Sequence, residues 1–488
     1  MLLNLLIFSV SVSIQWVSCH PNPHIVIVGS GAAGVAAATR LLKNNFTNIT
    51  ILEAESRIGG RIHSVKFGEA YVDLGANFCH GEKNNIVYSL TKDLGVLKNF
   101  PTEYRFLRSN GEILDKATAS KVIKFEESVA FLEKHEKCKN LSSVGECLKI
   151  KSGDFIKSAE NPKETEIFSE AYDWVESSVC SLNAAFDLND LNITSAFQDS
   201  EGDQNLKWKG HGYKTILDIM MEKFPNAENP LPIDEKIFLD KEVTNITNWR
   251  EDTATVLTND GDKYEADHVI FTPSLGVLKA SHKNLFEPDL PEDKVKAING
   301  IGFGAIVTII MHFPVKWWDG PADFPVMWTT EHKEKLKEEN LEWLSTMTGT
   351  VQAENNTHVI LSWYGGKYVP HIETLSEEEV RKGLIHLLNL FFSPRFNVTM
   401  PDKIIRTLWY SNPHFKGTYS YESVKGFLKA GVKLPETLSK PLLKNNKNLS
   451  ILFAGEATSP DHFSTVHGAI ESGYREADRL INFYNTKL

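Results

Sequence analysis

The pattern of hydrophobic and polar positions is most regular near the N-terminus, where the apolar run Ile25–Val28 contains no polar residue. A short run of this kind predicts a strand that is buried on both faces of a sheet. A glycine-rich stretch follows, and residues 35–42 then have the alanine and leucine content typical of a helix. A second run, Ile49–Leu52, predicts another strand. The segment therefore predicts the strand, tight turn, helix and strand that begin an α/β fold.

Similar patterns predict further elements along the chain. Asn259, Asp260 and Gly261 form a turn signal between strands expected over residues 242–246 and 263–272. Three acidic residues after Ser376 predict a helix start. Other helices are expected over residues 121–137, 163–179, 215–224, 376–392 and 468–483, and other strands over residues 305–313, 358–364 and 448–453.

Composition and charge narrow the class of protein. A chain of 488 residues exceeds the usual size of one hydrophobic core, so two domains are expected. The contents of 42% hydrophobic and 24% charged residues are those of an ordinary globular protein. The net charge of −11 argues against a nucleic acid or an anionic membrane as partner, whereas it suits a cationic substrate.

The glycine-rich stretch has the spacing of a dinucleotide-binding turn. Gly29 permits the tight turn, Gly31 lets the backbone approach a pyrophosphate, and Gly34 lets the helix pack closely on the strand. The helix N-terminus then directs its free N–H groups at phosphate charge. Glu53 ends the second strand near the spacing at which a carboxylate meets a ribose hydroxyl. The alternative is a glycine-rich turn in some other α/β unit.

Four further motifs separate a flavin from a nicotinamide dinucleotide. They are Arg57-Ile58-Gly59-Gly60-Arg61, Asp73-Leu74-Gly75-Ala76-Asn77, Phe453-Ala454-Gly455-Glu456-Ala457-Thr458 and Val466-His467-Gly468-Ala469-Ile470-Glu471-Ser472-Gly473. With these motifs, the chain resembles the flavin-containing amine oxidases from about residue 23 to its C-terminus. Within that family it most resembles the polyamine oxidase branch, which includes spermine oxidase and N1-acetylpolyamine oxidase.

The resemblance implies a two-domain flavin amine oxidase fold of the α/β class. A Rossmann-like FAD-binding domain and an α+β substrate domain would each be built from discontinuous segments. The FAD-binding domain would take residues 20–101, 209–284 and 435–488, and the substrate domain residues 102–208 and 285–434.

The resemblance also implies which residues contact FAD. Glu456 matches a residue at the ribityl–phosphate part of the flavin, with a solvated loop acid as the alternative. Thr465 and Val466 precede the last helix, whose N–H groups would stabilise charge on the reduced ring. Thr418 stands where monoamine oxidases carry the cysteine that links the flavin, so we expect noncovalent FAD. The expected contacts are Gly29, Gly31, Ala33, Gly34, Glu53, Arg61, Gly75, Ala76, Asn77, Val243, Trp409, Gly455, Glu456, Thr465 and Val466.

The substrate side has weaker signals. His80 coincides with a histidine near the substrate in the resembled enzymes, and the alternative is a structural histidine bonded to backbone. Asp199 falls where those enzymes carry an acid that pairs with substrate ammonium, although an exposed loop residue is the alternative. Trp363 and Tyr419 are candidates for an aromatic wall that favours a cation. For either ring, ordinary core packing is the alternative.

One position departs from the family's catalytic pattern. Thr308 stands where the family normally carries a lysine, held by water to flavin N5, that helps oxygen accept electrons. A threonine hydroxyl has neither the charge nor the reach of that side chain. No spacing of cysteine and histidine suggests a metal site.

The ends of the chain and its cysteines bear on localisation. Residues 1–19 have the apolar core of a secretory signal peptide, with cleavage expected after Cys19. The C-terminal Thr486-Lys487-Leu488 resembles a peroxisomal signal, and we favour export. Cys138 and Cys147 are expected to form a disulfide, with two free thiols as the alternative. Sequons at Asn45, Asn48, Asn140, Asn192, Asn245, Asn355, Asn397 and Asn448 agree with export.

These observations lead to three hypotheses for function. The first is a secreted FAD-dependent polyamine oxidase that passes hydride from the amine's α-carbon to flavin N5 and reduces O2 to hydrogen peroxide. The second, which Thr308 motivates, is a secreted FAD-binding protein with weak or lost oxidase activity. The third is an L-amino-acid oxidase, which would need an arginine to hold the substrate carboxylate. No membrane span is expected.

Overall fold

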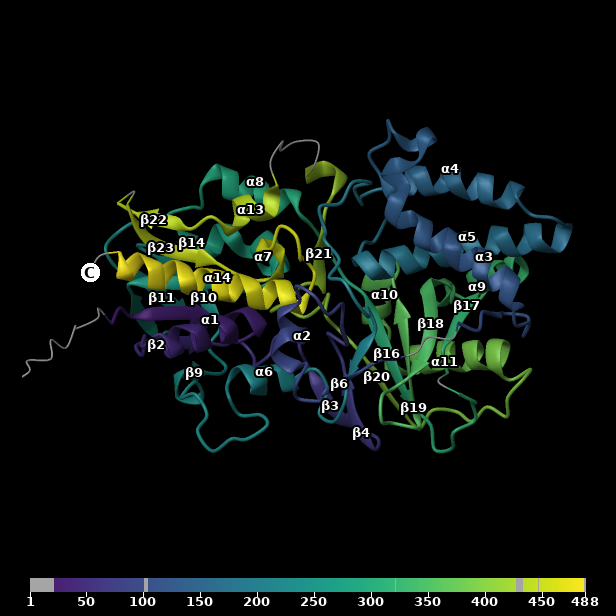
Figure 1. Ribbon diagram of the computed structural model, residues 1–488. Coiled ribbons are helices and arrows are strands. Elements are labelled where there is room, and N and C mark those ends of the chain that lie inside the picture. The colour runs from purple at the N-terminus through teal and green to yellow at the C-terminus, as the bar shows by residue number, and fades with distance from the viewer. Residues whose placement is uncertain (1–21, 101–103, 321, 427–432, 446, 487–488) are drawn as a thin grey trace, which may run out of the picture.

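A computed structural model describes residues 22–100, 104–320, 322–426, 433–445 and 447–486, and its ribbon has two lobes (Figure 1). The first lobe is organised around a six-stranded sheet in which β1 lies between β13 and β2. All its pairings are parallel except that of β22 with β23. The order across the sheet is β22 (Leu442–Lys444), β23 (Asn448–Phe453), β13 (His268–Phe271), β1 (Ile25–Val28), β2 (Ile49–Leu52) and β9 (Ile237–Phe238).

The two faces of β1 explain its unbroken apolar sequence. Ile25 and Ile27 point to one core cluster, and Val26 and Val28 point to another, as the period of a strand requires. On the first face, α1 (Ala32–Lys43) and α14 (Val466–Asn485) lie side by side, as the purple and yellow helices of Figure 1 show.

Elements of the four-stranded sheet and neighbouring helices cover the other face of the β1 sheet. Ile246, Val256 and Leu275 belong to the same core cluster as Val26 and Val28. The elements are β12 (Lys263–Ala266), β11 (Ala254–Thr258), β10 (Val243–Thr247) and β14 (Phe286–Glu287), in that order, with α7 (Leu275–Leu285), α8 (Glu292–Gly300) and α13 (Leu434–Ser439).

The second lobe is organised around another six-stranded sheet, whose neighbours are antiparallel except for β17 and β7. Its order is β20 (Lys403–Arg406), β16 (Val307–His312), β19 (Val359–Tyr364), β18 (Met347–Gln352), β17 (Phe324–Met327) and β7 (Leu107–Arg108). The helices of this lobe are α3 (Lys116–Glu127), α4 (Val144–Lys157), α5 (Pro162–Asn183), α9 (Thr330–Glu338), α10 (Val369–Thr374) and α11 (Glu377–Leu387).

Smaller elements complete the chain. The short strands are β3 (Ser64–Phe67) and β4 (Ala70–Asp73); β5 (Phe78–Cys79), β8 (Leu206–Trp208) and β6 (Leu97–Lys98); and β15 (Gly302–Gly304) and β21 (Tyr419–Tyr421). The remaining helices and turns are α2 (Ile86–Thr91), α6 (Thr215–Met220), η1 (Ser128–Lys134), η2 (Glu136–Cys138), η3 (Asp234–Lys236), η4 (Glu342–Thr346), η5 (Leu388–Phe392) and η6 (Glu456–Thr458).

Several sequence predictions are confirmed, others are wrong at a boundary, and the strand expected over residues 263–272 is two strands, β12 and β13, in different sheets. The strands at 25–28, 49–52 and 448–453 have the predicted limits. The helix expected over 121–137 instead begins after Asp115, whose side chain accepts the N–H groups of Ala117 and Thr118. It ends at Glu127, where η1 continues the chain.

The predicted turn at Asn259-Asp260-Gly261 joins β11 to β12, so the sequence prediction missed one strand, β11. Strand β11 alternates buried and half-buried residues over only five positions, which makes a weak pattern in the sequence. The helix predicted from Ser376 is confirmed, because Ser376 and Glu379 form a capping box ahead of α11.

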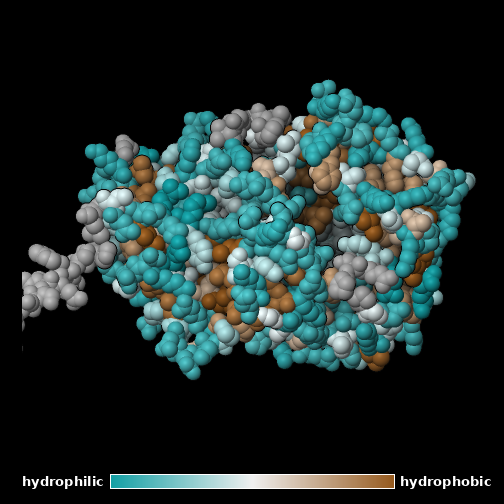
Figure 2. All heavy atoms as spheres, in the orientation of Figure 1, coloured by the Kyte–Doolittle hydropathy of each residue, from teal (hydrophilic) through white to brown (hydrophobic). Residues whose placement is uncertain are grey.

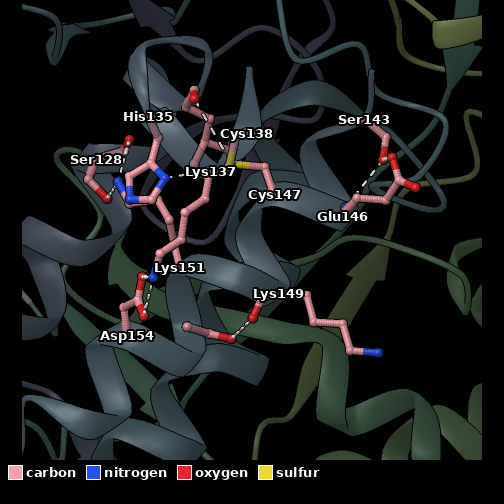
Figure 3. Close-up of a disulfide and its surroundings, with 12 residues drawn as sticks. Ser128, His135, Lys137, Cys138, Ser143, Glu146, Cys147, Lys149, Lys151 and Asp154 are labelled. Carbon is pink, nitrogen blue, oxygen red and sulfur yellow. Dashed lines mark hydrogen bonds and ion pairs between the residues drawn. A yellow bond between two sulfur atoms is a disulfide. The ribbon is translucent and has the colours of Figure 1, made fainter. Parts of the chain in front are cut away.

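The predicted disulfide between Cys138 and Cys147 is present and ties η2 to α4 (Figure 3). Cys79 and Cys180 are buried free thiols. Within the described residues, no helix has the length and apolar character needed to cross a bilayer. The proposed signal peptide at 1–19 and most of the C-terminal tripeptide lie outside the described residues. The domain boundaries stay predictions.

Candidate active site

A cavity of about 1170 Å³ lies at the junction of the two lobes. Figure 2 shows a hollow on this face, bordered by brown apolar side chains, where the lobes meet. Residues from both ends of the chain and from its middle line the cavity. They include every residue expected at FAD or substrate except Gly34.

The glycine-rich turn forms one wall of the cavity. Gly29 has φ of +96°, a conformation that side-chain-bearing residues rarely adopt. Gly31 is the N-cap of α1 and has no side chain to occupy the first N–H groups, so these remain available to an anion in the cavity. Gly34 does not line the cavity. A Cβ there would lie 2.0 Å from the Gly29 oxygen, so its role is the close packing of α1 on the turn.

Glu53 is fixed at the end of β2 by hydrogen bonds within the protein. Its Oε2 accepts the backbone N–H and the hydroxyl of Ser30, at 2.8 and 2.7 Å, and Oε1 accepts the N–H of Glu55 at 2.9 Å. The carboxylate is buried and lines the cavity. This geometry holds an acceptor ready for a ribose diol, and that contact stays a prediction.

Glu456 is buried, so the alternative of a solvated loop acid is wrong. Its Oε1 accepts from Arg61 at 2.9 Å, and its Oε2 accepts from the Ser420 hydroxyl at 2.6 Å and the Ser464 N–H at 2.8 Å. Arg61 also donates to the carbonyl oxygen of Thr418 at 2.6 Å. One carboxylate therefore joins segments of the chain that are hundreds of residues apart in sequence.

The remaining expected cofactor contacts line the same cavity, except Gly34. Trp409 donates its Nε1–H to the Leu74 oxygen at 2.9 Å, which sets the ring against Gly75. Thr465 caps α14 by accepting the Gly468 N–H, and the first turn of α14 contains no acidic side chain. The other members that line the cavity are Ala33, Ala76, Asn77, Val243, Gly455 and Val466.

These residues fit FAD. Two helix N-termini and a glycine turn offer N–H groups to phosphate and ring oxygens, and a fixed carboxylate stands at the end of β2. The cavity exceeds the usual range for a small ligand, which is roughly 300–1,000 Å³, and leaves room for a substrate. Burial raises the pKa of the Cys79 thiol to about 12, so that thiol is protonated and unreactive. With Thr418 at the linking position, the site suits noncovalent FAD.

His80 lines the cavity, and one of its ring nitrogens is hydrogen-bonded to the protein. Its Nδ1 lies 2.7 Å from the Gln204 carbonyl oxygen. A carbonyl only accepts, so Nδ1 carries the hydrogen and Nε2 of the neutral ring is an acceptor. Burial lowers the pKa of His80, while the Gln204 carbonyl and the charge of Asp199 oppose that shift. His80 therefore presents a neutral acceptor to the cavity.

Asp199 and the two aromatic candidates line the same cavity as His80. Asp199 is exposed, and its charge acts on His80. The Tyr419 hydroxyl donates to the Ser181 oxygen at 2.6 Å, so its hydrogen is engaged, while its oxygen can still accept and its ring can still contact a ligand. Trp363 pairs with Thr308 across β19 and β16. The roles of these residues stay predictions.

In the part of the chain that the structure describes, no lysine near Thr308 supplies the missing charge. Lys296 pairs with Glu292 at 2.7 Å on an exposed surface, and the Lys316 ammonium lies over Trp318. Among the described residues, Lys241 is the lysine that lines the cavity, and it forms ion pairs with Asp260 and Asp262. The departure at Thr308 is therefore not compensated by another cavity-lining lysine in the described chain.

Asp323 and His467 are among the polar residues of the cavity wall that sequence reasoning missed. His467 lies in the motif from Val466 to Gly473, which by itself predicts no role for this side chain. Its Nε2 is buried and has no hydrogen-bond partner in the described part of the protein. Burial, together with the charges of His462 and His80, lowers the pKa of His467 to about 3. Asp323 lies just before a strand in a stretch that no motif marks.

Comparison with known proteins identifies the relatives of this chain. The family described as flavin containing amine oxidoreductase matches residues 32–481. The human peroxisomal N(1)-acetyl-spermine/spermidine oxidase is 29% identical, over 95% of this chain and 96% of its own length. Its counterpart from Bos taurus is 30% identical with the same coverage. The probable polyamine oxidase 5 of Arabidopsis thaliana is 26% identical over 94% of this chain and 98% of its own.

Among solved structures, a redesigned putrescine oxidase aligns with a TM-score of 0.67. The alignment covers 94% of this chain and 99% of that one. At 17% sequence identity, this likeness bears on the fold alone.

Proposed function

Because the chain belongs to the flavin containing amine oxidoreductase family, we propose that its substrate is a polyamine and its electron acceptor O2. The chain is an FAD-dependent amine oxidase with a two-domain flavin amine oxidase fold. The polyamine substrate follows from relatives that are named as polyamine oxidases and align over nearly the whole chain. Spermine, spermidine and their acetylated forms are the proposed substrates.

The neutral Nε2 of His80 is the observation that carries this proposal. It gives the cavity a hydrogen-bond acceptor for an amine N–H, close enough to Asp199 for that charge to act on it. Bound FAD supplies the hydride acceptor and passes both electrons to O2, which gives hydrogen peroxide. His80 orients the reacting nitrogen, and the aromatic rings of Trp363 and Tyr419 exclude water from it.

Anaerobic mixing of the FAD-loaded protein with each amine tests this function. We expect the flavin absorbance to bleach with at least one polyamine and peroxide to form when O2 is admitted. A flavin that stays oxidised with every polyamine would overturn the proposed substrate class.

Thr308 supports a second candidate, a flavoprotein that binds amines but turns over slowly with O2. In both candidates the amine reduces the flavin rapidly. In the second, O2 reoxidises the reduced flavin slowly. Stopped-flow mixing of the reduced protein with O2 separates them, since rapid peroxide formation would exclude the second candidate. An L-amino-acid oxidase is not favoured, because Arg61 is the arginine among the described residues that lines the cavity, and Glu456 already holds it.

The proposed localisation is the extracellular space. The disulfide between Cys138 and Cys147, the eight sequons and the N-terminal apolar segment support export. Expression of the full chain in cultured cells should yield glycosylated protein in the medium that begins at His20. Retention in peroxisomes, with loss of that targeting after removal of Thr486-Lys487-Leu488, would overturn this proposal.

A further inference from the structure

Asp323 is an acidic residue of the cavity wall whose side chain accepts no hydrogen bond from the described residues. It immediately precedes β17, lines the cavity and is 7% exposed. Its Oδ2 is buried and has no hydrogen-bond partner, and no ion pair in the described chain involves it. Leaving a buried carboxylate oxygen without a donor is unfavourable, so the native protein needs a reason to keep it.

The positive charges of Lys207 and Arg105 act on the Asp323 carboxylate from a distance, and each of these side chains makes a closer contact with another residue. The Lys207 ammonium lies 3.4 Å from the centre of the Phe100 ring, and Arg105 pairs with Asp319 at 2.8 Å. Burial raises the pKa of Asp323 to about 6, and the charges of Lys207 and Arg105 oppose that rise. The Asp323 carboxylate is therefore ionised at neutral pH. Its Oδ2 still has no hydrogen-bond donor among the described residues.

The strand register places Asp323 far across the sheet from Thr308. Thr308 pairs with Trp363, Trp363 with Gly349, and Gly349 with Pro325. Asp323 lies two residues before Pro325, so it belongs to the same face of the sheet. Three strand spacings and two residues along β17 separate Asp323 from Thr308 by about 15 Å. Both residues line the one cavity.

We propose that Asp323 binds the distal ammonium of a long polyamine whose reacting nitrogen lies at the other end of the cavity. An ammonium supplies both the missing hydrogen-bond donor and an opposite charge, and such charge-assisted bonds are the stronger kind. Phe78 and Phe100 also line the cavity, and because the Lys207 ammonium already lies over both rings, they offer apolar surface to the methylene groups of the amine. This inference rests on the proposed function for its choice of ligand. It implies that the cavity selects amines by their length.

Two probes of equal length isolate the distal ammonium. A twelve-carbon α,ω-diamine and the matching twelve-carbon monoamine differ only at the far end. Their dissociation constants are measured by anaerobic calorimetry with the FAD-loaded protein reduced beforehand by dithionite, because a reduced flavin cannot accept hydride from the amine. We expect the wild-type protein to bind the diamine about tenfold to a hundredfold more tightly than the monoamine.

The Asp323→Asn variant keeps the shape of the side chain and removes its charge. We expect it to lose the preference for the diamine while its affinity for the monoamine stays unchanged. Glu354→Gln is the matched control, because Glu354 pairs with Lys98 and influences Lys207 but does not line the cavity. That control should keep the wild-type preference. An unchanged preference in Asp323→Asn would overturn the inference.

A series of shorter diamines tests the same idea in the wild-type protein, should the variant not fold. Affinity should fall steeply once the diamine cannot span from the reacting end to Asp323, and an affinity independent of length would overturn the inference. The proposed function fails separately, if no polyamine bleaches the flavin. Because the calorimetric preference is read without turnover, the two failures are distinguishable.

Discussion

The two ends of the cavity differ in how far the protein satisfies its own polar groups. At the dinucleotide end, the carboxylates of Glu53 and Glu456 each accept several hydrogen bonds from the protein. Elsewhere along the cavity wall, Asp323 and His467 keep buried atoms without partners among the described residues, and the protein hydrogen-bonds only one ring nitrogen of His80. A cofactor that stays bound can occupy a site whose polar groups the protein has already hydrogen-bonded in place. A substrate that binds and dissociates needs polar groups that have no partner until it binds.

The largest effect is expected from breaking the completed end at Glu456. Glu456→Ala removes the acceptor of Arg61, Ser420 and Ser464 together, and loss of one partner of a buried charged network costs about 3–5 kcal/mol. We expect the free energy of unfolding to fall by about that amount and FAD to be lost on gel filtration. Urea denaturation and the flavin absorbance measure the two effects.

The control is an ion pair of the same kind on the surface. Lys43 and Glu222 lie 2.7 Å apart with side chains 48% and 45% exposed. Glu222→Gln should change the unfolding free energy by less than about 1 kcal/mol and leave FAD bound. If Glu456→Ala behaved like this control, the cofactor end would not depend on its internal hydrogen bonds.

A glycine substitution gives the next largest effect. A Cβ at Gly75 would lie 1.9 Å from the Arg61 oxygen and 3.2 Å from the Trp409 ring. Gly75→Ala should therefore cost about 1–3 kcal/mol and weaken FAD binding. Gly153, in α4, has no atom within 4 Å of its ideal Cβ, so Gly153→Ala should instead stabilise the protein by about 0.5–1 kcal/mol. Equal unfolding free energies for the two variants would show that the Gly75 contact relaxes freely.

The same contrast explains what the sequence could predict. The cofactor end is built from local motifs, in which Gly29, Gly31 and Glu53 stand at fixed spacings within one unit. The substrate end depends on strands far apart in sequence. Asp323 faces the cavity only because β17 pairs with β18 in one particular register, which no local pattern reveals. The burial of Glu456, which excludes a solvated loop acid, likewise depends on the assembled fold and not on a local motif.

At the substrate end, His80→Asn should slow flavin reduction by about tenfold to a hundredfold, because the asparagine cannot present the same acceptor. Protonation of Nε2 would remove the acceptor in the wild-type protein too. Since burial lowers the pKa of His80, the acceptor is present at neutral pH and is lost as the pH falls through that lowered value. The wild-type rate should therefore decline on an acid limb that lies below the ordinary pKa of histidine, and the variant should lack that limb.

Anaerobic stopped-flow reduction over a range of pH checks this prediction. The ionisation of the amine itself adds a second limb, and because it belongs to the substrate it should be common to both proteins. Asp199→Asn is the companion variant. The charge of Asp199 raises the pKa of His80, so its removal should move the acid limb to lower pH. An acid limb that persists unchanged in His80→Asn would assign it to another group.

The smallest and most selective effect is expected at Thr308. Thr308→Lys should accelerate reoxidation by O2 by about tenfold and change flavin reduction much less, because a cation stabilises charge that develops as oxygen is reduced. Thr308 is buried, so burial should lower the pKa of the new lysine. The acceleration should then be greatest at low pH and fade as the pH rises through that value. Thr308→Val, which brings no charge, is the control. If both variants reoxidise at the wild-type rate, the threonine does not limit the reaction with O2, and slow turnover would need another cause.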